Sequence, residues 1–106
     1  MKNPVGPVLR MGEEVDQIIA AIEDDNPDTD IEIIDRGSYV RIQGEERVVL
    51  TEASLQAYLG SDYRIRSLEN LMSSFSGRAI TASDSITWLS SGARKDAAPV
   101  TEGADR

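Results

Sequence analysis

Neither histidine nor cysteine occurs among the 106 residues of this chain. Disulfide cross-links are therefore impossible, and the usual ligands of structural zinc are missing. The chain must fold around a hydrophobic core, and its 40% hydrophobic content is enough for one small domain. That core has to be mainly aliphatic, because the sequence contains only five aromatic residues: Tyr39, Tyr58, Tyr63, Phe75 and Trp88.

The same two absences restrict the chemistry available to the chain. Histidine is the side chain that titrates nearest neutrality and the commonest metal ligand, and cysteine is the strongest nucleophile. Only two lysines are present, Lys2 and Lys95, and both lie outside the expected core. We therefore expect no cofactor, no metal and no catalytic residue, and a protein that binds and regulates.

The chain is strongly acidic, with a formal net charge of −8 from 19 acidic and 11 basic residues. This balance argues against nucleic acid and anionic membrane surfaces as partners. No apolar run approaches the roughly 20 residues of a membrane helix, and the N-terminus begins no secretory segment. The expected location is the cytoplasm.

The acidic residues are concentrated between Met11 and Asp35, where there are ten acids and no base. One interpretation is a solvated helix face followed by an acidic loop. The other is an acidic surface that steers the protein towards a basic partner. The first interpretation is the more economical one.

The N-terminal third predicts a strand followed by a helix. Residues 1–11 form a short apolar segment, and Pro7 within it favours an edge strand or an extended arm that orders only on docking. A helix opens at Gly12 and ends at Asn26-Pro27. One helical stripe carries the apolar residues Val15, Ile18, Ile19 and Ile22. Three acids sit at the end of this helix that the dipole disfavours, which can mark a functional surface: Glu23, Asp24 and Asp25.

The middle of the chain predicts strands and then helices. Residues 31–35, 39–42 and 47–50 are separated by short turns and suggest a three-stranded antiparallel meander. Thr51 is a good N-cap for a helix that ends near Leu59, before Gly60.

Ser67 is a second N-cap candidate, and the helix after it would run until Gly77. Its inward residues would be Leu68, Leu71, Met72 and Phe75. Residues 79–81 and 85–89 predict a closing hairpin. Residues 90–106 have the composition of a flexible, disordered polar tail.

Strands and helices grouped in this way, with hairpin-length connections, indicate an α+β fold. We expect a single small domain over residues 12–89, with mainly antiparallel sheet and about three helices.

No candidate for catalysis or metal binding stands out. The carboxylate pairs are sequence neighbours without apolar surroundings that would raise a pKa. Residues 24–30 are rich in oxygen ligands but lack the spacing, glycine and terminal glutamate of an EF-hand loop. The run from Ser73 to Gly77 places three hydroxyls near one aromatic ring, which suits either a helix end or a contact surface.

Several segments together resemble the small effector, or coupling, proteins of bacterial multicomponent di-iron monooxygenases. These proteins serve toluene, phenol, alkene and methane monooxygenases. The segments begin with a Val-Gly-Pro arm and end in a Ser-Phe-x-Gly sequence: residues 3–12, 25–27, 35–36, 39–42 and 69–77.

The resemblance implies a cofactor-free regulatory protein that is not itself an enzyme. Its partner would be the di-iron hydroxylase component, whose oxygen activation, substrate access and coupling it would modulate. It would share or compete for the docking surface of a ferredoxin or reductase. We expect six residues to face the hydroxylase: Arg36, Tyr39, Asn70, Ser73, Ser74 and Phe75.

Two alternatives remain open from the sequence. The first is a small α+β regulatory domain that senses a metabolite, which would be stabilised by its ligand without any partner. The second is an enzyme that uses a carboxylate together with Tyr39, Tyr58 or Tyr63.

Overall fold

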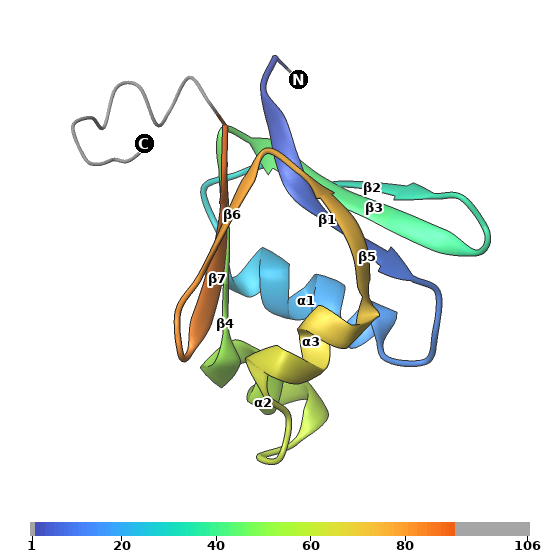
Figure 1. Ribbon diagram of the computed structural model, residues 1–106, viewed down its shortest axis with the longest axis vertical. Coiled ribbons are helices and arrows are strands. Elements are labelled where there is room, and N and C mark those ends of the chain that lie inside the picture. Colours follow the sequence, from blue (N-terminus) through green and yellow to red (C-terminus); the bar gives the residue numbers. More distant parts are fainter. Residues whose placement is uncertain (1, 91–106) are drawn as a thin grey trace.

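A computed structural model describes residues 2–90 of the chain. Its elements follow the order strand, helix, three strands, two helices and three strands (Figure 1). In chain order they are β1 (Pro4–Arg10), α1 (Val15–Asp25), β2 (Glu32–Asp35), β3 (Tyr39–Glu45), β4 (Arg47–Thr51), α2 (Glu52–Leu59), α3 (Ile65–Leu71), β5 (Met72–Ser76), β6 (Arg78–Thr81) and β7 (Ser85–Leu89).

The strands form two antiparallel sheets. One sheet has the order β2-β3-β1-β5, and the other has the order β4-β7-β6. Figure 1 shows α1 beneath the four-stranded sheet and beside β4, with α2 and α3 at the opposite end of the molecule from the β5–β6 corner. The predicted α+β class, with mainly antiparallel sheet and three helices among the described residues, is confirmed.

The core between these layers is aliphatic, with Trp88 as its largest buried side chain. The predicted stripe of α1 supplies Val15, Ile18 and Ile22, which are all buried, while Ile19 packs at its margin. Ile86 and Trp88 both face inward from β7, as the alternation of the closing hairpin predicts.

The N-terminal strand lies inside its sheet, so the expectation of an edge strand or a free arm over residues 1–11 is wrong. β1 pairs with β3 on one side and with β5 on the other. The missing N–H of Pro7 is accommodated because Gly6 and Pro7 have no register partner in β3. Gly6 has φ +145°, and a Cβ there would lie 2.0 Å from the Ile42 carbonyl oxygen, so only glycine permits this close approach.

The predicted three-stranded meander is also wrong, because β3 and β4 belong to different sheets. β2 and β3 do form the expected hairpin. Gly44 continues β3, and the chain turns at Glu46, which has φ 67°. β4 then pairs with β7, a strand about 40 residues later, which local turn signals do not reveal.

The third predicted helix is shorter and begins earlier than expected. α3 starts after Arg64, not after Ser67, and ends at Leu71. Met72 to Ser76 then form β5, because their backbone pairs with β1. The helical spacing of Leu68, Leu71 and Met72 is therefore overridden by tertiary pairing.

The remaining boundaries follow the sequence closely. The Thr51 side chain accepts a hydrogen bond from the Ser54 N–H and caps α2, and Gly60 follows with φ 105°. Ser90, the first residue of the predicted tail, is buried, and its N–H donates to the Glu46 carbonyl at 2.9 Å. The rest of the predicted tail, residues 91–106, lies outside the described residues.

Candidate functional site

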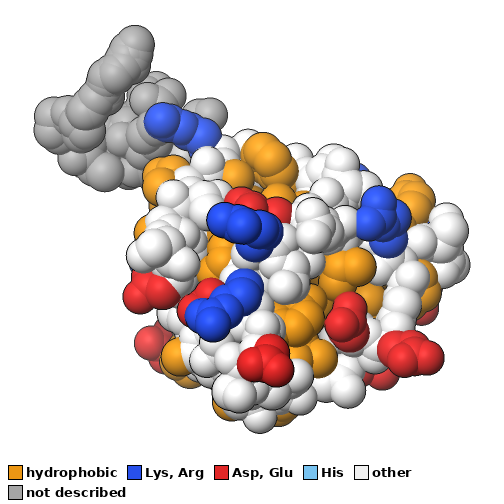
Figure 2. All heavy atoms as spheres, turned by 60° about the horizontal axis from the view of Figure 1, so that its bottom comes forward, with side chains coloured by type: hydrophobic (Ala, Val, Ile, Leu, Met, Phe, Trp, Pro, Cys, Tyr) orange, Lys and Arg blue, Asp and Glu red, His pale blue; other side chains and the backbone are white. Residues whose placement is uncertain are grey.

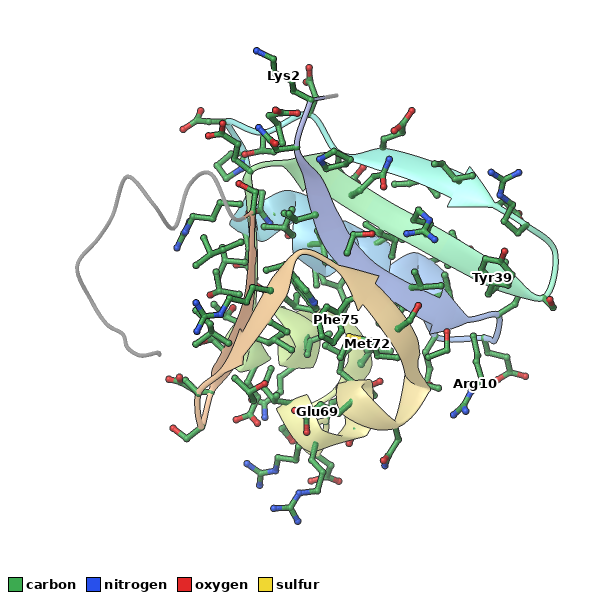
Figure 3. The ribbon with its side chains drawn as sticks, turned by 45° about the horizontal axis from the view of Figure 1, so that its top comes forward. Lys2, Arg10, Tyr39, Glu69, Met72 and Phe75 are labelled. Carbon is green, nitrogen blue, oxygen red and sulfur yellow. The ribbon has the colours of Figure 1, made fainter. Side chains whose placement is uncertain are left out.

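Three segments that are distant in sequence meet at one end of the four-stranded sheet. Arg10, the last residue of β1, pairs with Tyr39 at the start of β3. Its guanidinium also donates a hydrogen bond to the main-chain carbonyl of Asn70, near the end of α3. Arg10 therefore brings Tyr39 and Asn70, two of the predicted contact residues, onto one surface. Figure 3 shows Arg10 and Tyr39 at this end of the sheet.

The β2–β3 turn completes this surface. The Arg36 N–H donates to the Tyr39 carbonyl at 2.9 Å, and the Met11 N–H donates to the Ser38 carbonyl at 3.0 Å. Met11 and Tyr39 are large apolar residues that remain 42% and 39% exposed. Exposed aromatic, methionine and arginine side chains are the composition of protein–protein contacts, so this end of the sheet has the character of a docking surface.

Ser73 and Ser74 extend the surface along β5 in different ways. The register of β5 against β1 shifts at Ser73, which is the extra residue of a bulge, and its hydroxyl donates to the Val8 carbonyl at 3.2 Å. Ser74 pairs with Val8, which pairs with Arg41 on its other side, so the three share one face. Leu9 and Val5 point to the opposite face of β1, which packs on the core. The face shared by Ser74, Val8 and Arg41 is therefore the outer face of the sheet.

Phe75 does not share that face. It is adjacent to Ser74 along β5 and pairs with Pro7, so its side chain points to the other side of the sheet. Figure 3 shows Phe75 and Met72 under the arch formed by β5 and β6, away from Tyr39. Phe75 is nevertheless 45% exposed, so it is not a buried core residue, although the sequence predicts it to point inward from a helix.

Two of the three acids at the end of α1 hold α2 in place. The Asp25 carboxylate accepts hydrogen bonds from the Thr51 N–H at 2.8 Å and from the Ser54 hydroxyl at 2.6 Å. Asp24 accepts one from the Tyr58 hydroxyl at 2.5 Å. Asp25 thus lies at the N-terminal end of α2, where a helix favours negative charge, which accounts for its position at the end of α1.

Two of the three tyrosines that were candidates for catalysis, Tyr58 and Tyr63, have raised pKa values. The hydrogen bond to Asp24 and the nearby acids raise the pKa of Tyr58 above its usual value. Burial, and then the charge of Glu14, raise the pKa of Tyr63. Both shifts favour the neutral phenol, which is a poor base.

Between residues 2 and 90 no three acidic side chains are grouped so as to hold a metal ion. Within that range, too, no helix is long and apolar enough to cross a membrane.

The space-filling view of Figure 2 shows apolar side chains interspersed with charged ones at the end of the molecule that carries α2 and α3. An open hollow beside the start of α2 is lined by Thr51, Glu52, Ala53, Gln56, Asp84 and Ser85.

Comparison with known proteins places the chain. Residues 3–89 match the sequence pattern of the MmoB/DmpM family. The chain belongs to the MmoB/DmpM family. This confirms the resemblance seen in the sequence. The match begins at Asn3 and ends at Leu89, so it includes β1, the β2–β3 turn and the α3–β5 segment that build the surface.

Named MmoB/DmpM relatives extend this finding. The chain is 39% identical over 87 residues to a protein of Xanthobacter autotrophicus (strain Py2) described as the effector subunit of an alkene monooxygenase system. That similarity covers 82% of this chain and 86% of the relative.

Solved structures agree with the fold. A chain in a phenol hydroxylase–regulatory protein complex superposes with a TM-score of 0.72 at 23% identity, covering 81% of this chain and 97% of the other. Regulatory protein B of soluble methane monooxygenase gives a TM-score of 0.66 at 23% identity, covering 95% of this chain and 74% of the other. At such identities these likenesses establish the shared architecture of this MmoB/DmpM protein.

Sequence reasoning missed Arg10 as part of the surface. The sequence shows it as a single base at the end of an apolar segment, ahead of the acidic run. Its contact with Asn70 spans 60 residues, and nothing in local spacing signals a contact of that kind.

Proposed function

We propose that this chain is the effector, or coupling, subunit of a multicomponent monooxygenase and binds the hydroxylase component of that system. The observation that carries the proposal is the 39% identity, along 82% of the chain, to a protein described as an alkene monooxygenase effector subunit. The hydroxylase would supply the di-iron site and the substrate pocket for an alkene or aromatic hydrocarbon. This chain would supply no catalytic group, and it would work in the cytoplasm.

The mode of action is differential binding. An effector shifts its partner between two states only by the difference in its affinity for them. A hundredfold shift requires about 2.7 kcal/mol of difference. A few well-placed contacts of aromatic, arginine and amide groups reach that magnitude.

The contacts that we propose are those at the end of the four-stranded sheet: Arg36, Tyr39, Asn70 and Ser74, with Ser73 beside them. Tyr39 and Arg36 are exposed, and Ser74 lies on the outer face, where its hydroxyl makes no hydrogen bond to another of residues 2–90. Phe75 belongs to a second contact under the β5–β6 arch, because it faces the opposite side of β5. A ferredoxin or reductase that docks on the same part of the hydroxylase would compete with this surface.

The test is a titration of this protein into the hydroxylase and electron-transfer components encoded with it. We expect an increase in the rate of product formation and in product formed per NADH consumed, with no turnover by this protein alone. Unchanged rate, coupling and regiospecificity at saturating protein would refute the proposal.

Variants then locate the surface. Tyr39→Ala and Asn70→Ala are expected to weaken hydroxylase binding by at least about tenfold for a contact of the usual strength. Gln17→Ala, an exposed residue of α1, is the matched control and should bind as the wild type does. Equal binding by all three variants would remove the end of the sheet from the interface.

A thermal-shift series with candidate hydrocarbons and no partner separates the metabolite-sensing alternative. The effector proposal predicts no ligand-dependent stabilisation of the isolated protein. A dose-dependent increase in Tm would favour a sensor.

A further inference from the structure

The passage from α3 to β5 has no loop. α3 ends at Leu71, and β5 begins at the next residue, Met72. The N–H of Met72 donates to the carbonyls of Leu68 and Glu69, which closes the last turn. The backbone therefore changes from helix to strand within one residue, beside the proposed contact residues.

The local sequence does not favour this change. Leu68, Leu71, Met72 and Phe75 have the spacing of one face of a longer helix, yet Met72 and Phe75 lie on a strand. A conflict between local preference and observed structure requires tertiary contacts to resolve it, and such conflicts concentrate at functional sites.

The strand pairing that opposes the helical preference is itself weak. β5 has five residues and pairs with one strand, β1. Its Phe75 lies opposite Pro7, which has no N–H to donate, and the register is broken at Ser73. Side-chain contacts from neighbouring strands must supply the remaining restraint.

Arg10 makes the contact closest to the change of backbone. Its guanidinium donates to the Asn70 carbonyl, one of the last carbonyls of α3, which have no N–H partner inside the helix. α3 has no basic residue in its own last turn, so the cation that such a helix end favours comes from β1. Ser73 adds a hydrogen bond to Val8, and Arg41 donates to the Ser76 hydroxyl at 2.8 Å.

We propose that Arg10 is a positioning residue, which fixes the end of α3 at Asn70 and so holds Met72–Ser76 in its strand form, with Asn70 and Ser74 presented as one fixed surface. This proposal rests on the proposed function for its consequence, the docking of a hydroxylase. Arg10 acts on affinity through the order of this segment, whether or not it also touches the partner.

Hydrogen exchange of the free protein tests the positioning role without any hydroxylase. In Arg10→Ala, amide exchange within residues 70–76 should rise about fivefold or more relative to wild type, as loss of one charge-assisted hydrogen bond implies. Exchange in α1 should be unchanged. Arg10→Lys, which retains a donor, should give an intermediate rise, and Ser73→Ala should loosen the same segment by an independent contact.

The matched control is Arg78→Ala. Arg78 is an exposed arginine of β6 whose guanidinium makes no hydrogen bond or ion pair within residues 2–90. If Arg10→Ala loosens residues 70–76 no more than Arg78→Ala does, the proposal is overturned.

Titration into the hydroxylase tests the consequence. Arg10→Ala should raise the concentration needed for half-maximal effect by about fivefold, while the rate at saturation stays that of wild type, because the bound state restores the segment. Arg10→Lys should recover part of the affinity. A fall in the saturated rate with unchanged affinity would overturn the positioning role.

The two proposals fail in different ways. If wild-type protein leaves the hydroxylase unaffected, the proposed function and the docking consequence both fall, while the exchange measurement still decides the role of Arg10 in the free protein.

Discussion

The side chain of Asn26 hydrogen-bonds to both backbone groups of Val49, as a neighbouring strand would. Its Nδ2 donates to the Val49 carbonyl at 2.7 Å, and its Oδ1 accepts from the Val49 N–H at 3.0 Å. Nδ2 also donates to the Ile22 carbonyl at 2.6 Å, so one buried carboxamide closes the end of α1 and protects the free edge of β4.

Replacement of Asn26 by alanine should therefore destabilise the protein by about 2–3 kcal/mol, because buried backbone groups lose their partners. Urea denaturation measures this change. Asn26→Asp should be less stable at pH 7 than at pH 4, since an ionised carboxylate would face two carbonyl oxygens. Asp28→Ala, in the exposed loop nearby, should stay within about 0.5 kcal/mol of wild type. A wild-type midpoint for Asn26→Ala would contradict this role.

Gly6 should not tolerate a methyl group. A Cβ at this position meets the Ile42 carbonyl oxygen at 2.0 Å, and φ is +145°. We expect Gly6→Ala to cost more than about 3 kcal/mol or to prevent folding. Gly12→Ala is the matched control, because a Cβ there has no neighbour within 4 Å. Thermal unfolding followed by circular dichroism distinguishes the two, and similar Tm values would rule out the close approach of β1 and β3.

Two acids in the last turn of α1, Glu23 and Asp25, should respond differently to substitution. Asp25→Ala removes the carboxylate that accepts from Thr51 and Ser54, which should cost about 1–2 kcal/mol. Glu23 is exposed and its carboxylate makes no hydrogen bond or ion pair within residues 2–90, so Glu23→Gln should be neutral or slightly stabilising. Chemical denaturation of both variants checks the contrast. Equal losses would show that general charge, not the Asp25 contact, matters.

Alkaline stability should depend on Tyr58. Its hydrogen bond to Asp24 raises its pKa above the unfolded value of about 10. Folding therefore favours the protonated phenol, and this contribution is complete below the unfolded pKa and disappears as pH rises through the folded pKa. Urea midpoints compared between pH 8 and pH 11 should fall more steeply for wild type than for Tyr58→Phe. Parallel declines would refute this coupling.

Local patterns predicted those elements whose identity depends on neighbouring residues. The stripe from Val15 to Ile22 predicted α1, Thr51 predicted the start of α2, and alternation predicted β7 with its buried Trp88. In each case a single amphipathic face or a single cap decides the conformation, and both are properties of short stretches of sequence.

Errors arose where a distant strand decided the outcome. β5 reads as helix because its apolar spacing is helical, but pairing with β1 makes it a strand. β1 reads as an edge because of Pro7, but a skipped pair at Gly6 and Pro7 lets it lie between two strands. The candidate surface could not be predicted from local patterns for the same reason, because Arg10 brings Asn70 and Tyr39 together although the three residues are far apart in sequence.

The sequence by itself determined the class of the fold, the family, and the lack of any histidine or cysteine chemistry, because composition, periodicity and motif order are carried by the chain. Only the tertiary structure decided that β4 leaves the first sheet, that Asp25 serves α2, and that Phe75 and Ser74 face opposite sides. Each of these depends on pairing between residues far apart in sequence, whose free energy exists only once the sheets have assembled.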